Sequence, residues 1–173
     1  MKTIKVLLVL ILAFASGSIK AQDLKALDDK YGFRDMKFGT DISEYQTMSL
    51  VESSKDSLTK YYIKTDEKLN IGKFDLKSIN YGFYKGKLFF VYIKTKGYIN
   101  SRGVLATLEE LYGKGYQSNQ YIDNYDWFGN LVVASYDENS ITNDAKIMID
   151  SKTIKKQMDE DKKKAVSNAK GDM

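Results

Sequence analysis

The chain has 173 residues, a formal net charge of +4, and no cysteine, histidine or proline. Without cysteine and histidine it can form no disulfide, no Ser-His-Asp triad and no zinc site that needs either residue. Its 13 tyrosines and 8 phenylalanines are typical of a sheet protein.

Residues 1–21 have the layout of a secretory signal peptide. Lys2 and Lys5 supply a short positive region, Val6–Ala15 is an unbroken apolar run, and the residues up to Gln22 are small or polar. A run of this length is too short to span a bilayer, which takes about 20 apolar residues. We therefore expect export followed by cleavage, with a retained signal anchor as the less common alternative.

The favoured cleavage site follows Ala21, and Gly17 is the alternative. Removal of this segment takes away three lysines and leaves a net charge of about +1. Nothing global then indicates nucleic-acid binding, which usually requires a basic face.

The first half of the remaining chain contains short elements. We expect a helix over Asp23–Lys30, a strand over Phe33–Phe38, a helix capped by Thr40 or Asp41 that runs to Met48, a strand over Leu58–Lys64, and a turn or short strand over Glu67–Ile71.

A hairpin between Lys77 and Thr95 is the clearest pattern in the chain. Apolar and polar residues alternate over Lys77–Tyr84, and a tight turn containing Gly86 leads into Lys87–Thr95. Strict alternation would place Leu88, Phe90 and Tyr92 on one face of the returning strand, and Phe89, Val91 and Ile93 on the other. A strand that is apolar on both faces is normally central, so we expect helices on at least one face of the sheet.

The second half is predicted to contain one long helix and three more strands. The helix is capped by Asn100 or Ser101 and stopped by Gly113. The strands are expected over Tyr121–Phe128, Leu131–Tyr136 and Ala145–Asp150. From residue 152 onward the chain is charged, and Ile154 and Met158 are the residues expected to dock its first turns.

This order of elements predicts an α+β fold: a mainly antiparallel sheet with two or three helices packed on it. The expected organisation is a signal peptide over 1–21, a single domain over 22–151, and a charged helical or disordered tail over 152–173.

Three segments carry a family resemblance: Tyr31–Thr40, Ile79–Leu88 and Leu111–Tyr116. They resemble motifs in uncharacterised families of small exported bacterial proteins. More loosely, the chain is similar to the compact modules of the outer-membrane assembly lipoprotein and β-lactamase-inhibitor type. The resemblance implies an interaction module and not an enzyme. The chain departs from the lipoproteins because no cysteine follows the leader.

Motifs for catalysis and metal binding are weak. The glycines of Tyr81–Lys87 are too close together for a phosphate loop. The oxygen ligands of Asp137–Asn139 and Asn143-Asp144 lack the central glycine and closing glutamate of a calcium loop. A spacing of three places Asp123 and Asp126 on opposite faces of a strand. We therefore expect no catalytic residue, no metal and no cofactor.

The best candidate site is one face of the strand predicted over Tyr121–Phe128. Tyr121, Asp123, Tyr125 and Trp127 share that face. If exposed, they would offer a flat platform for a sugar ring or a partner side chain. If buried, they are simply part of the core, which is the interpretation we favour because aromatics are common on packed sheet faces.

The sequence thus favours an exported, non-catalytic binding module of the bacterial cell envelope, periplasmic or secreted. The alternative is a binder of glycans or small ligands that uses the aromatic strand face, and a hydrolase using carboxylate, Tyr or Lys comes third. The expected partner is an envelope protein or a glycan and not a nucleic acid, and no transmembrane helix is expected in the mature chain.

Overall fold

The computed structural model describes residues 24–171, so the predicted signal peptide and its cleavage sites lie outside the described residues. Three α-helices and a mostly antiparallel sheet confirm the α+β class. The helices are α1 (Leu24–Lys30), α2 (Tyr98–Tyr112) and α3 (Lys152–Gly171). Within this part of the chain no helix combines the length and apolar character needed to cross a membrane.

The main sheet has eight strands, and every pairing in it is antiparallel. Its order is β3-β4-β6-β7-β10-β9-β8, and β5 pairs with β6 outside this path. The strands are β3 (Met48–Ser53), β4 (Thr59–Lys64), β5 (Asn70–Ile71), β6 (Phe74–Tyr84), β7 (Lys87–Thr95), β8 (Asn124–Phe128), β9 (Val132–Glu138) and β10 (Ala145–Ser151).

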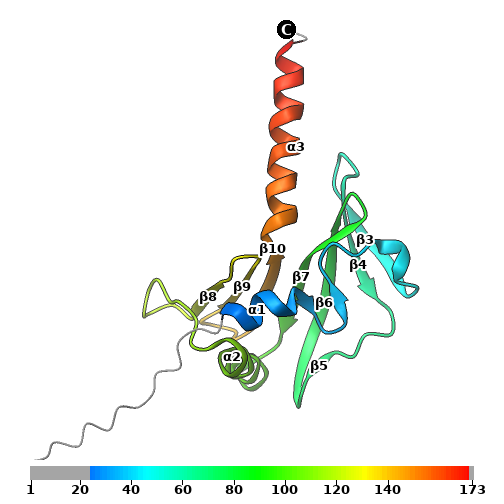
Figure 1. Ribbon diagram of the computed structural model, residues 1–173. Helices are drawn as coiled ribbons and strands as arrows, with labels where there is room; N and C mark the ends of the chain where they lie inside the picture. Colours follow the sequence, from blue (N-terminus) through cyan, green and yellow to red (C-terminus); the bar gives the residue numbers. More distant parts are fainter. Residues whose placement is uncertain (1–23, 172–173) are drawn as a thin grey trace, which may run out of the picture.

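The hydrophobic core lies between one face of the sheet and a layer formed by α1, α2 and the segment that follows α1 (Figure 1). Leu27 of α1 and Val104 of α2 are fully buried in this core. The largest buried side chains of the sheet face are Trp127, Tyr81 and Tyr136. Burial of such aromatic side chains dominates the stability of a core of this size.

The segment predicted as one strand over Phe33–Phe38 is instead a small hairpin. Strands β1 (Gly32–Phe33) and β2 (Met36–Lys37) pair with each other, and the turn between them places Arg34 at a φ of 55°. A left-handed residue is uncommon outside glycine, asparagine and aspartate, so the sequence gives no local sign of this turn.

The region after this hairpin also differs from the prediction. Asp41 does act as a cap, because its Oδ1 accepts a hydrogen bond from the Ser43 backbone N–H at 3.0 Å. The helix is however only the 3-10 turn Ile42–Glu44, and the residues from Met48 form the edge strand β3. Most of β3 is exposed, so it lacks the alternation of apolar and polar residues by which a strand is recognised.

The central hairpin is confirmed with one correction. Tyr84 pairs with Lys87 across a two-residue turn in which Lys85 and Gly86 both have positive φ. A bulge at Phe89 then breaks the alternation, because Gly82 pairs with Phe90 while Phe83 pairs with Leu88. As a result Leu88 shares the core with Val91 and Ile93, and Phe90 and Tyr92 lie on the opposite face.

Helix α2 starts earlier than predicted. It begins at Tyr98 after Gly97, without a side-chain cap. The two predicted caps have other roles: Asn100 accepts a hydrogen bond from the Asp75 N–H, and the buried Ser101 hydroxyl donates to the Asn143 carbonyl. The helix ends at Gly113, as predicted.

Helix α3 has 20 residues, about 30 Å of helix, and projects away from the sheet (Figure 1). Ile154 and Met158 pack against Tyr84 and Phe89, so the predicted docking of the first turns is confirmed. Asp161 extends this attachment, because its carboxylate accepts from the Tyr84 hydroxyl at 2.9 Å and pairs with Lys85 at 2.6 Å.

Candidate binding face

The face of the sheet opposite the core carries the candidate site. Its side chains form three cross-strand rows, which we call the open face. The first row is Tyr61, Gly82, Phe90, Asp150, Val133 and Phe128. The second row is Asn80, Tyr92, Met148, Ser135 and Asp126, and the third is Ser78, Lys94, Lys146, Asp137 and Asn124.

Helices α1 and α2 lie on the core side of the sheet, as the buried cluster shows. Among residues 24–171, α3 is the helix that contributes hydrophobic contacts to the open face, through Ile154 and Met158 beside the first row. Asp150 belongs to this attachment, since Lys155 Nζ lies 3.0 Å from its Oδ1. Burial raises the pKa of Asp150, although the pairing with Lys155 opposes the shift. The second and third rows lie beyond these contacts.

The first two rows of the open face contain half-buried aromatic rings that contact one another. Phe90 is stacked on Tyr92 with ring centroids 6.1 Å apart, and Tyr61 meets Phe90 edge-on at 6.4 Å. Gly82 lies between Tyr61 and Phe90 in the register, and a Cβ there would approach the Phe90 Cβ to 3.0 Å. Because Gly82 has no side chain, the rings of Tyr61 and Phe90 can meet above β6. The middle of the open face is therefore apolar.

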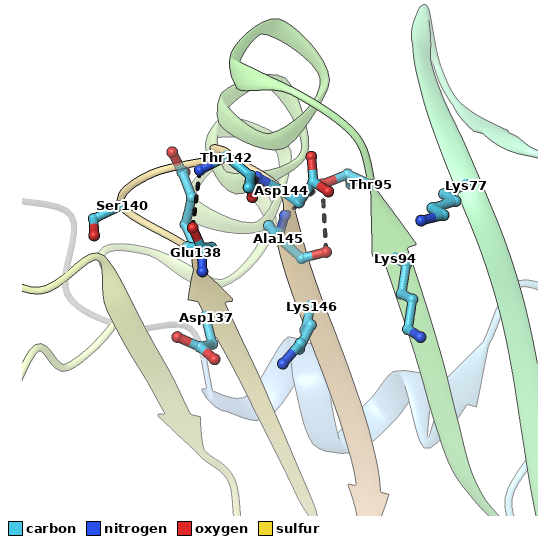
Figure 2. A pocket seen from close by; sticks show the side chains of 11 residues that line it. Lys77, Lys94, Thr95, Asp137, Glu138, Ser140, Thr142, Asp144, Ala145 and Lys146 are labelled. Carbon is cyan, nitrogen blue, oxygen red and sulfur yellow. Dashed lines mark hydrogen bonds between the residues drawn. The ribbon is translucent and has the colours of Figure 1, made fainter.

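The third row, which we call the basic row, carries two lysines and one aspartate. Lys94 and Lys146 lie directly opposite each other on β7 and β10, and Lys77 of β6 joins them at the edge of a shallow basin of about 480 Å³. Figure 2 shows these three lysines side by side across their strands, next to the loop that carries Ser140. Lys94 Nζ lies 5.1 Å from the centre of the Tyr92 ring, a cation–π distance that links the basic row to the aromatic one.

These lysines form no ion pair within the part of the chain that the structure describes. None of the three forms an ion pair with a carboxylate of residues 24–171, and Asp137, the cross-strand neighbour of Lys146, forms none either. Like charges directly opposite each other destabilise a sheet. The basin therefore places three lysines without ion pairs beside an apolar region, with Asp137 as the carboxylate opposite Lys146 in the register.

The loop over residues 139–144, at the edge of the basin, uses its side-chain oxygens for hydrogen bonds within the fold. Asp144 Oδ1 accepts a hydrogen bond from the Gly97 N–H at 2.9 Å, and Asn139 Oδ1 accepts from the N–H groups of Ile141 and Thr142. Within residues 24–171 no three acidic side chains are grouped so that they could hold a metal ion. The oxygen ligands considered for calcium thus shape the rim of the basin.

The structure places the four residues of the predicted aromatic platform in different environments. Trp127 is fully buried, and its Nε1–H donates to the Gly113 carbonyl at 2.8 Å. Tyr125 packs against the core, whereas Tyr121 is 86% exposed. Strand β8 begins only at Asn124, so Tyr121 and Asp123 lie in the turn before it and the four side chains form no flat exposed row.

Asp123 belongs to a polar network that sequence reasoning did not identify. Its carboxylate binds the Arg102 guanidinium, which also pairs with the buried Glu138 at 3.1 Å. Glu138 in turn accepts from the hydroxyl of Tyr136. The hydrogen bond that the guanidinium donates to Asp123 raises the pKa of Arg102, and burial raises the pKa of Tyr136. The network therefore joins α2 to β9 and to the turn before β8. In it the guanidinium of Arg102 stays charged and the hydroxyl of Tyr136 stays neutral.

Sequence reasoning also missed the basic row. Lys94 and Lys146 are each a charged residue within an otherwise apolar strand, and this pattern could have marked them as candidates. Their opposition depends on the pairing of β7 with β10, which are separated by 49 intervening residues and cannot be paired from sequence pattern alone.

No family model, no curated protein and no solved structure matches this chain. Function is therefore inferred from geometry, and the resemblance to exported interaction modules stays a prediction.

Proposed function

We propose that the protein is an exported, non-catalytic binding module whose protein partner docks on the open face. The observation that carries the proposal is the opposition of Lys94 and Lys146, which form no ion pair among residues 24–171, next to the stacked rings of Phe90 and Tyr92. A protein segment that presents acidic side chains beside apolar ones would complement both parts of this surface.

The size of the open face and its mixture of apolar and charged residues support a protein partner over a glycan. The second row, which lies beyond the contacts of α3, crosses five strands, a width of about 19 Å at the usual strand spacing. The rings of Phe90 and Tyr92 are half-buried against their neighbours, whereas a sugar platform requires a freely accessible ring face. A broad, partly apolar face with a charged margin is typical of a protein interface.

Export is the second part of the proposal and depends on the leader-like sequence over 1–21. We expect the protein in the periplasm or outside a bacterial cell, with Gln22 as its first residue. N-terminal sequencing or intact-mass analysis of the protein from each cell fraction tests this. A full-length chain that still carries Met1 and remains in the cytosol would contradict it.

The open face is tested by crosslinked capture from envelope extracts with paired variants. Lys94→Glu with Lys146→Glu reverses the charge of the basic row, and we expect loss of a stoichiometric protein partner. The matched control is Lys68→Glu with Lys114→Glu, because both lysines are exposed and lie outside the open face. Capture that is equal for both pairs would contradict the assigned surface. Bound material that survives protease and consists of glycan would replace the protein partner with the alternative.

A further inference from the structure

A second cavity lies on the core side of the sheet, away from the open face. It measures about 330 Å³ and opens between α2 and the residues around β1 and β5. Its floor is formed by Ile93, Ile147 and Ile149, which belong to the buried face of the sheet. Val104 and Leu108 of α2 form an apolar wall. The layer that covers the core thus leaves a slot that reaches down to the sheet.

Two polar groups in the lining of this slot can still form a hydrogen bond or an ion pair with a ligand. Tyr112 is buried, and its hydroxyl has no hydrogen-bond partner among the described residues. Burial raises the pKa of Tyr112, so the hydroxyl is a neutral donor at pH 7. Thr107, the other hydroxyl of the lining, already donates to the Gly103 carbonyl of its own helix.

The second group is the ammonium of Lys30. It donates to the backbone carbonyl of Arg34 but pairs with no described carboxylate, and the residue is only partly exposed. The neighbouring Arg34 differs, because its guanidinium binds Glu67 and the Asn70 carbonyl. Lys30 is therefore the positive charge at this rim that the fold does not compensate.

We propose that this slot binds a small amphipathic anion, with its apolar part on the isoleucine floor and its anionic group at Lys30. At about 30 Å³ for each water-sized group, the volume takes an apolar part of roughly ten heavy atoms. This matches one short chain and is too small for a two-chain lipid. An apolar slot with few polar groups at its edge is the usual form of a small-ligand site.

Decanoate is the probe, and 1-decanol and decyltrimethylammonium are its uncharged and cationic counterparts. Methyl NMR of the mature chain should show saturable shifts of Ile93, Ile147 and Leu108, with decanoate binding more tightly than either counterpart. Lys30→Met should weaken decanoate about tenfold, the value of one charge-assisted hydrogen bond, and leave 1-decanol unchanged. Thr107→Trp should fill the slot and abolish binding of both.

The wild-type titration alone can overturn the proposal, whether or not a variant folds. Absence of saturable shifts, shifts confined to the open face, or equal affinity for the three probes would each do so. Lys114→Met is the matched control for Lys30→Met, because it removes an exposed lysine outside the slot. Uptake of phosphatidylglycerol from vesicles into the slot would overturn the single-chain assignment.

Discussion

The two faces of the sheet use similar residues in different ways. On the core face of the sheet the three largest buried aromatic side chains have hydrogen-bond partners within the fold, since Tyr81 donates to Glu67, Tyr136 to Glu138 and Trp127 to a backbone carbonyl. On the open face Lys94 and Lys146 form no ion pair with any carboxylate of the described residues. Buried polar groups that find partners stabilise a fold, whereas polar groups without partners remain available to a ligand. The comparison separates structural residues from candidates for binding.

Trp127→Ala should have the largest effect and tests the assignment of this residue to the core. The indole is fully buried and hydrogen-bonded, so we expect a loss of about 3–5 kcal/mol in the free energy of unfolding. Urea unfolding followed by circular dichroism measures this. A variant of nearly wild-type stability that fails to bind a glycan would restore the platform interpretation.

Arg102→Met should be nearly as damaging. Removal of the guanidinium leaves the carboxylate of Glu138 buried without its counterion, which typically costs about 3 kcal/mol. The same unfolding experiment applies. Combining Arg102→Met with Glu138→Gln should recover part of the loss, because the uncompensated charge is then absent; an equal or greater loss in the double variant would contradict this role.

Asp28 joins α1 to the turn between β8 and β9 and gives a prediction about pH. Its carboxylate accepts from the N–H groups of Asn130, Leu131 and Val132 at 2.6, 2.8 and 3.0 Å. Burial raises the pKa of Asp28, but these three donors outweigh it, so the pKa lies below its ordinary value. We expect Asp28→Asn to cost about 2 kcal/mol at pH 7.

The sign of this pH dependence follows from the lowered pKa. The stabilisation is complete above the unfolded pKa of about 3.9 and is lost as the pH falls through the lower pKa of the folded state. The difference between wild type and Asp28→Asn should therefore be largest at neutral pH and shrink towards pH 2. A difference that stays constant over this range would show that the charge of Asp28 does not contribute.

Lys94→Glu should have the smallest effect on stability, and with the opposite sign. The substitution replaces a like-charged cross-strand pair with an opposite-charged one, so we expect a gain of about 0.5 kcal/mol. The gain should fade in high salt, because surface charges are screened. A loss of stability on this substitution would mean that Lys94 contributes to the fold and would weaken the case for the basic row as a site.

Patterns between near neighbours were predictable from the sequence. The hairpin of β6 and β7 and the end of α2 at Gly113 follow from alternation and from a glycine at the position that a turn or helix end needs. The β1–β2 hairpin was not predictable, because its turn uses Arg34 in a left-handed conformation that only the surrounding contacts, such as the pair with Glu67, sustain.

The candidate site was harder to predict because it depends on which strands are neighbours. The aromatic residues around Trp127 are prominent in the sequence, but Trp127 is buried in the core and Tyr121 is exposed in the turn before β8. The open face arises where β7 and β10 pair and where the bulge at Phe89 turns Phe90 and Tyr92 away from the core. Neither event leaves a periodic signal in the chain.

The sequence by itself determined the fold class, the chemistry that absent residue types exclude, and the local turns and helix ends, because these depend on residue type and on spacing over a few positions. The tertiary structure alone decided which aromatic residues are buried, which lysines stand together, and where cavities remain. The physical reason is that burial and charge pairing are properties of segments distant in the chain, fixed only when the strands of the sheet come into register.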